Sequence, residues 1–160
     1  MLKDYALLEE NAKTWIYPSS KKIYPKELEE FQNKVEEFLE HWQQEGQDIP
    51  CAYQLKYNRI LVVITSSEFP LKTPAINSLN TCIAELEARF ETVLMDKMNP
   101  CFKQGDYVQY KDLKSFKKLI KDKAVTKKTI VFDNMVHTKG DYEAYWEIPA
   151  EDSWYGHMFK

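Results

Sequence analysis

Apolar positions in the first half of the chain recur with two spacings, one typical of strands and one typical of helices. Residues 14–17 form a short β-prone run that is closed by Pro18. After Pro25, which suits the first position of a helix, apolar residues recur every three or four positions until Gly46 can stop the helix. They are Leu28, Phe31, Val35, Phe38, Leu39 and Trp42. This stripe must be buried, and we expect it to face a sheet.

A hairpin and a second helix are predicted next. Residues 51–57 alternate between apolar and polar side chains, as in a half-buried strand, and a short link joins them to residues 60–64. Because 60–64 is apolar at every position, we expect a central strand that is covered on both faces. Thr73 as N-cap and Pro74 at the first position begin a second helix, and residues 92–95 are predicted to form a fourth strand.

The order strand, helix, strand, strand, helix, strand predicts an α+β fold with a ferredoxin-like split βαβ core, βαββαβ. Beyond it the pattern adds a C-terminal β-α-β extension, with strands at 107–110 and 129–132 around a helix at 113–121, and then an irregular aromatic tail. We expect these elements to extend or cover the first sheet. The chain, 1–160, is interpreted as a single domain with a core at about 12–97 and an extension at about 100–160.

Composition is that of a packed protein inside a cell. With 44% hydrophobic, 14% aromatic and 29% charged residues, the 160-residue chain is expected to fold unaided. Its longest apolar run, 60–64, is far shorter than the roughly 20 residues that cross a bilayer, and its first residues lack the apolar core of a signal peptide, so no membrane partner is expected. Three widely spaced cysteines, Cys51, Cys82 and Cys101, favour reduced, buried thiols and a cytoplasmic protein.

Glycine spacing excludes the familiar nucleotide-binding motifs. The four glycines of the chain lie too far apart to build a P-loop, a dinucleotide-binding fingerprint or a nucleophile elbow. No Cys or His residues form the closely spaced pairs of structural zinc sites. We therefore expect no cofactor and no metal, and the protein is predicted not to be a P-loop ATPase. Whether it is an enzyme is left open, with a non-catalytic role favoured.

Charge is distributed unevenly along the chain. Residues 111–128 contain eight lysines and two aspartates, a net charge of +6, whereas the whole protein carries −3. Residues 27–48 contain eight acids and one lysine, a net charge of −7. On a helix at 113–121 four lysines fall on one side, opposite the apolar residues. We call these four the lysine face: Lys114, Lys117, Lys118 and Lys121.

The lysine face is the candidate binding site. A face of this kind holds phosphates of nucleic acid, a phosphorylated small molecule or an acidic partner protein. The leading hypothesis is therefore a non-catalytic domain that binds an anionic ligand or partner, and a solvated face that only keeps the protein in solution is the simpler alternative. Two others are a small enzyme of unfamiliar type, with a cleft near the ends of strands four and five at Asp96, Lys97 and Asp106, and a homo-oligomer whose acidic and basic helices meet between subunits.

Eight aromatic residues lie near or after the basic segment. If exposed, they would stack on bases or other rings; we expect them instead to be buried and to pack the tail onto the domain. They are Tyr107, Tyr110, Tyr142, Tyr145, Trp146, Trp154, Tyr155 and Phe159.

Five stretches of the chain carry a resemblance to known proteins. They read Trp15-Ile16-Tyr17-Pro18-Ser19, Asp96-Lys97-Met98, Phe102-Lys103-Gln104-Gly105-Asp106-Tyr107-Val108, Thr129-Ile130-Val131-Phe132-Asp133-Asn134 and Trp146-Glu147-Ile148-Pro149-Ala150-Glu151-Asp152-Ser153-Trp154. In them the chain resembles a family of small bacterial proteins of similar length that is catalogued as "ABC transporter ATPase". The resemblance implies a family but no site residues, and the missing P-loop argues against the activity in that label.

Overall fold

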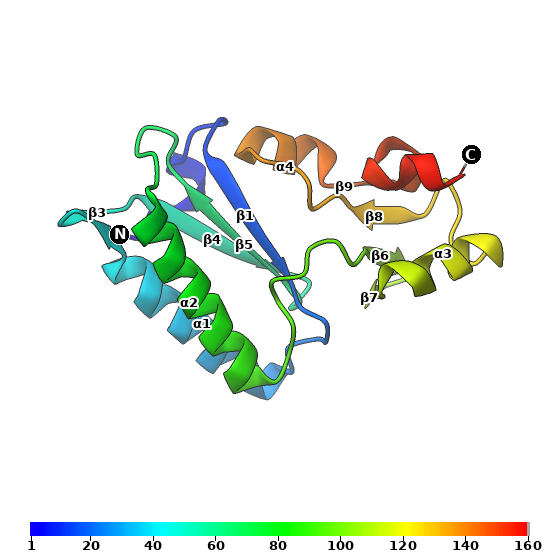
Figure 1. The fold of residues 1–160 in the computed structure, drawn as a ribbon, viewed down its shortest axis with the longest axis horizontal. Coiled ribbons are helices and arrows are strands. Elements are labelled where there is room, and N and C mark those ends of the chain that lie inside the picture. Colours follow the sequence, from blue (N-terminus) through cyan, green and yellow to red (C-terminus); the bar gives the residue numbers. More distant parts are fainter. Residues whose placement is uncertain (160) are drawn as a thin grey trace.

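The computed structural model describes residues 1–159, in which two helices cover an antiparallel sheet and a second sheet lies beyond it (Figure 1). The first sheet has the order β1-β5-β4, with β1 at Lys13–Pro18, β5 at Ile60–Thr65 and β4 at Cys51–Lys56. β1 and β4 each pair antiparallel with β5. All six residues of β5 are buried, which confirms the prediction of a central strand covered on both faces.

The helices α1 (Pro25–His41) and α2 (Thr73–Phe90) lie side by side on one face of this sheet (Figure 1). Their apolar stripes pack in one cluster with Leu61 and Val63 of β5, as the spacing predicts. Two boundary predictions are wrong. Thr73 is the first residue of α2, with Lys72 at the N-cap. α1 ends at His41, and Gly46 instead belongs to the left-handed turn of a short hairpin, β2 (Gln43–Gln44) with β3 (Gln47–Asp48).

The predicted fourth strand at 92–95 is also wrong. Its side chains alternate between buried and exposed, as in a strand. The N–H groups of residues 93–95, however, bond to side chains instead of a neighbouring strand. The Ser20 hydroxyl accepts the Val93 N–H at 2.9 Å. The Glu87 carboxylate accepts the N–H groups of the next two residues, at 2.7 Å and 3.2 Å. Side chains that satisfy these donors replace the ladder, so the segment stays a connection to the second sheet.

The second sheet has four antiparallel strands in the order β7-β6-β8-β9. The strands and helix of the predicted extension form within a residue of their expected positions. They do not extend the first sheet but build a sheet of their own, which packs against the first. The elements of this part are β6 (Cys101–Gln104), β7 (Tyr107–Tyr110), α3 (Leu113–Lys121), β8 (Ile130–Phe132), α4 (Lys139–Tyr145) and β9 (Glu147–Pro149). Short 3-10 turns lie at Tyr5–Leu7, Ala150–Asp152 and Trp154–Phe159.

Three apolar clusters hold the layers together. The first joins α1 and α2 to the first sheet. The second fills the space between the sheets, where Ile16, Val62 and Ile64 of the first meet Cys101 and Phe132 of the second. The third lies under α3 on the far face of the second sheet. The fold is therefore α+β, as predicted, whereas the ferredoxin-like arrangement is not confirmed because its fourth strand does not form.

Two further expectations concern the burial of the cysteines and the presence of a membrane-spanning helix. All three cysteines are free; Cys51 and Cys101 are buried, as expected, and Cys82 is half-buried. In residues 1–159 no helix combines the length and the apolar character that a membrane span requires.

Candidate functional site

Helix α3 is defined at its start by an aspartate. Asp112 is the N-cap, and its carboxylate accepts hydrogen bonds from the Ser115 N–H at 2.8 Å and the Ser115 hydroxyl at 2.9 Å. These bonds favour the charged carboxylate and hold the pKa of Asp112 below its ordinary value. The cap satisfies a backbone donor that the helix itself leaves free, so it helps to fix where α3 begins.

One side of α3 is anchored by an aromatic cluster. Phe116 is fully buried, and its ring centroid lies 5.5 Å from that of Phe102 and 5.2 Å from that of Tyr155. Both contacts are tilted arrangements typical of packed aromatic rings. Leu119 and Ile120 add half-buried contacts to the same cluster. Because this side faces the second sheet, the orientation of α3 is determined and its other side is turned to solvent.

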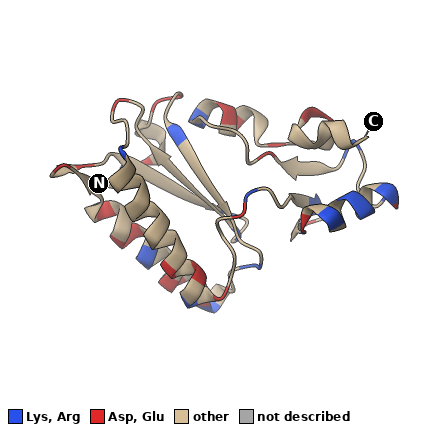
Figure 2. Ribbon diagram, viewed as in Figure 1, with Lys and Arg blue, Asp and Glu red and all other residues tan. Residues whose placement is uncertain are grey.

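The lysine face lies on that solvent side. All four of its lysines are exposed. Within the part of the chain that the structure describes, the ion pairs are formed by other cations, so the lysine face has no carboxylate partner there. Figure 2 shows α3 as a concentration of positive charge, at the opposite end of the molecule from α1 and α2. The acidic first helix therefore does not neutralise α3 within one chain.

The shape of the lysine face limits what it can bind. From Lys114 to Lys121 the helix advances about 10 Å, at about 1.5 Å per residue. The face is the outside of a helix, and none of its lysines lines any of the three cavities described for the protein. Such a surface can contact an extended anionic partner, but it cannot enclose a small molecule.

The largest of the three described cavities is a groove of about 780 Å³ between α1 and α2. Phe38, Trp42 and Leu86 supply its apolar part, and Cys82 lies beside them. Burial and, to a smaller extent, the neighbouring carboxylate of Glu85 raise the pKa of the Cys82 thiol to about 11. This thiol is therefore protonated at neutral pH and is a poor nucleophile.

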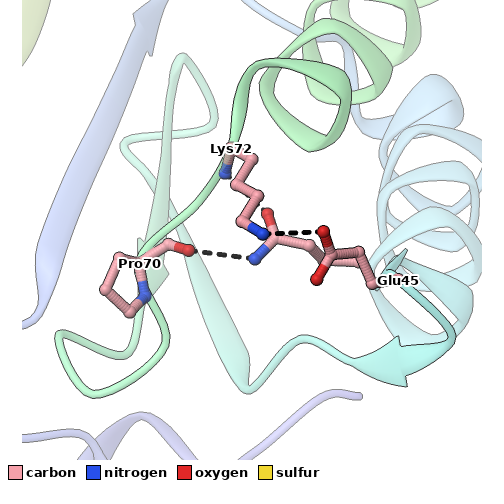
Figure 3. Close-up of polar contacts among 4 residues, drawn as sticks. Glu45, Pro70 and Lys72 are labelled. Atoms are coloured by element: carbon pink, nitrogen blue, oxygen red, sulfur yellow. Dashed lines mark hydrogen bonds and ion pairs between the residues drawn. The ribbon is translucent and has the colours of Figure 1, made fainter.

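The groove lies near the β2–β3 hairpin, which contributes Gln43 to its lining. Lys72, just before α2, forms an ion pair with Glu45 of that hairpin at 2.6 Å (Figure 3). The Gln44 side chain accepts the Lys72 N–H at 2.6 Å and donates to the carbonyl of Pro70 at 3.0 Å. These contacts fasten the hairpin to the start of α2. They hold the groove in place without adding a reactive group to it.

The residues predicted for an enzymatic cleft do not share one of the three described cavities. The Asp96 carboxylate accepts bonds from the Met98 N–H and the Asn99 side chain within its own loop. Lys97 is exposed, and Asp106 lines a separate cavity to which the other two do not contribute. Among residues 1–159 no group of three or more His, Cys, Asp or Glu side chains is arranged to hold a metal ion.

The aromatic residues of the C-terminal part divide into three groups by burial. Tyr142, Trp146 and Tyr155 are buried, which confirms the expectation for them. Tyr107 and Tyr145 are 72% and 60% exposed, so the expectation of burial is wrong for these two. Trp154 is also exposed, at 37%, against the same expectation, whereas Tyr110 and Phe159 are half-buried.

Arg59, for which the sequence pattern predicts no role, lies where the two sheets meet. Its guanidinium bonds to carbonyls of Ser19 and Ser20 on one side and of Val108 on the other. The composition could have drawn attention to this residue, because Arg59 is one of only two arginines among 22 basic residues. Arginine offers five N–H donors in a rigid plane, and lysine does not.

Comparison of the chain with protein-family models, with curated proteins and with solved structures gave no match.

Proposed function

We propose that this protein is a non-catalytic binding domain that holds an anionic partner on the lysine face. The observation that carries the proposal is the arrangement of α3, whose buried Phe116 fixes the helix while four exposed lysines point away from the domain. Unpaired, clustered cations of this kind attract an anion over several ångströms and are screened only by salt.

An acidic protein surface is the partner class that the structure favours. Outside residues 111–128 the chain carries −9, since the whole protein carries −3 and that segment +6. This charge repels a long nucleic acid that extends beyond α3. Three of the aromatic side chains that would stack on bases are buried in the core. A small phosphorylated molecule is disfavoured because none of the three described cavities is lined by a residue of the lysine face.

The test compares two variants of equal net charge. Fluorescence anisotropy measures binding of a labelled oligoglutamate and of a single-stranded oligonucleotide with the same number of charges. The variant K114Q/K117Q/K118Q/K121Q should lose oligoglutamate binding. The control K3Q/K26Q/K34Q/K97Q changes four exposed lysines elsewhere and should retain it. Equal loss in both variants, or no binding by the unchanged protein, would overturn the proposal. Tighter binding of the oligonucleotide would move the partner class to nucleic acid.

A second candidate function is assembly of identical chains. The specific observation is the separation in Figure 2, where the basic α3 and the acidic α1 lie at opposite ends of one molecule. Two such ends attract each other between copies and not within one. Sedimentation velocity at 20 mM and 500 mM salt distinguishes the two functions. Oligomers that dissociate at high salt support assembly, and a monomer at both concentrations rejects it.

We also propose an interpretation of the fold and setting of the protein. The order β1-β5-β4, with α1 and α2 on one face, is what a ferredoxin-like sheet retains without its fourth strand. The free cysteines are compatible with a reducing cytoplasm. The resemblance to the small bacterial family stays a prediction.

A further inference from the structure

A half-buried arginine without a carboxylate partner lies where the two sheets meet. Arg59 follows the β4–β5 turn, in which Tyr57 and Asn58 both adopt the left-handed conformation. Its Nε donates to the carbonyl of Ser19 at 3.1 Å, and Nη2 donates to that of Ser20 at 3.0 Å. Nη1 donates to a carbonyl of β7. Among residues 1–159 Arg59 takes part in none of the ion pairs.

These contacts leave some N–H groups of Arg59 without an acceptor and its positive charge without a negative partner. A guanidinium has five N–H groups, and the carbonyls occupy only three of them. Carbonyl oxygens satisfy donors but bring no net negative charge. Burial lowers the pKa of Arg59, which shows the cost of keeping this cation away from water. A half-buried cation of this kind is stabilised by an anion that reaches its free N–H groups.

Arg59 also lines a cavity of about 260 Å³ between two hairpin turns. Lys22 supplies a second cation, and Asp106 supplies the only carboxylate in the lining. The cavity therefore carries a net charge of +1. Tyr57 and Tyr107 line it as well and are 43% and 72% exposed, so a solute has access from the surface. At about 30 Å³ for each water molecule, the space suits a phosphate group and a few waters.

We propose that this cavity binds a small oxyanion, a phosphate group, between the unused N–H groups of Arg59 and the ammonium of Lys22. Planar guanidinium donors match the geometry of phosphate oxygens, and the ammonium adds a point charge. The site is independent of the lysine face: it uses other residues, and it encloses a small ion in place of contacting an extended surface. Free inorganic phosphate and a phosphate ester share this chemistry.

Two exposed residues allow a test that leaves the Arg59 contacts intact. Isothermal titration calorimetry measures binding of inorganic phosphate and of phosphoserine at constant ionic strength. Lys22→Gln should weaken binding about fivefold, and Asp106→Asn should strengthen it by a similar factor, because one unit charge at about 4 Å in water contributes about 1 kcal/mol. The control K114Q/K117Q/K118Q/K121Q should bind phosphate as the unchanged protein does. Retained phosphate binding in this variant also separates this site from the proposed function of α3.

Each result of these titrations either supports the oxyanion site or overturns it. Opposite effects of the Lys22 and Asp106 variants support the site. Tighter binding of phosphoserine then assigns the ligand to phosphate esters, and tighter binding of inorganic phosphate assigns it to the free ion. No heat of binding at 20 mM of either compound overturns the proposal, as does loss of binding in the lysine-face variant with no effect of Lys22→Gln.

Discussion

Lys139 is 7% exposed, yet its charge is met by backbone carbonyls and not by a carboxylate. Its ammonium donates to the carbonyls of Tyr5 and Leu8 at 2.9 Å and 2.7 Å, and it lies 4.3 Å from the centroid of the Tyr5 ring. These contacts fasten the N-terminal segment to the start of α4. Lys139 therefore joins two segments that are more than 130 residues apart in sequence.

Replacement of Lys139 by methionine should lower the free energy of unfolding by about 2 kcal/mol, because a buried carbonyl and a part-buried one lose a charged donor. Lys13 provides a matched control. It also lies 4.3 Å from an aromatic centroid, that of Trp15, but it is exposed. Lys13→Met should change stability by less than about 0.5 kcal/mol. Urea denaturation measures both, and equal effects would show that the carbonyl contacts contribute nothing.

The Glu9 carboxylate makes the stability of the fold depend on pH. Its carboxylate accepts the hydroxyls of Ser66 and Ser67 at 2.9 Å and 2.8 Å. Burial raises the pKa of Glu9, but hydrogen bonds from its own N–H and from the two serines outweigh this and hold the pKa at about 2. Because this pKa is depressed from 4.5, the contribution of Glu9 is complete above about pH 4.5 and is lost as the pH falls toward 2.

We expect Glu9→Gln to reduce the free energy of unfolding at pH 7 by about 1 kcal/mol, a value discounted for solvent screening. The variant should also lose less stability than the unchanged protein between pH 4.5 and pH 2. Glu10→Gln, at an exposed neighbour, should preserve the original pH dependence. Denaturation at a series of pH values checks this, and identical curves for Glu9→Gln and the unchanged protein would contradict it.

At the scale of elements, the packing of α3 depends on one buried aromatic side chain, that of Phe116. Phe116→Ala leaves a cavity between Phe102 and Tyr155 and should lower the free energy of unfolding by about 3–5 kcal/mol. Lys117→Ala, on the exposed side of the same helix, should cost less than about 0.5 kcal/mol. Thermal denaturation compares the two. A cost below about 1 kcal/mol for Phe116→Ala would show that α3 does not pack as described.

The spacing of apolar residues predicts a helix or strand correctly where the segment's own residues determine its structure. It fails where hydrogen bonds from another segment determine that structure. Phe116 and its apolar neighbours specify α3, and the continuous apolar run specifies β5. Residues 92–95 have a strand pattern, but Glu87 and Ser20 take their N–H groups. The apolar pattern does not predict α4, although Thr138 caps this helix by accepting the Asp141 N–H. The cap is a local signal within an aromatic segment whose pattern is irregular.

At the scale of the whole molecule, the two candidate sites differ in how far sequence reveals them. The lysine face can be recognised in the sequence because its residues lie on one helix with a regular spacing. The oxyanion cavity cannot be recognised in this way, because Lys22, Arg59 and Asp106 come from three separate connections between elements, which meet only when the two sheets pack together. The separation of the charged helices in Figure 2 is likewise a property of the assembled fold.

The central claim, that the lysine face binds an anionic partner, is tested most directly by the salt dependence of oligoglutamate binding. The logarithm of the dissociation constant is measured against the logarithm of salt concentration for the unchanged protein and for K114Q/K117Q/K118Q/K121Q. Our account predicts a steep slope for the unchanged protein and a nearly flat one for the variant, because neutralised lysines no longer exchange bound counterions for the partner. Equal slopes, or binding that does not respond to salt, would contradict it.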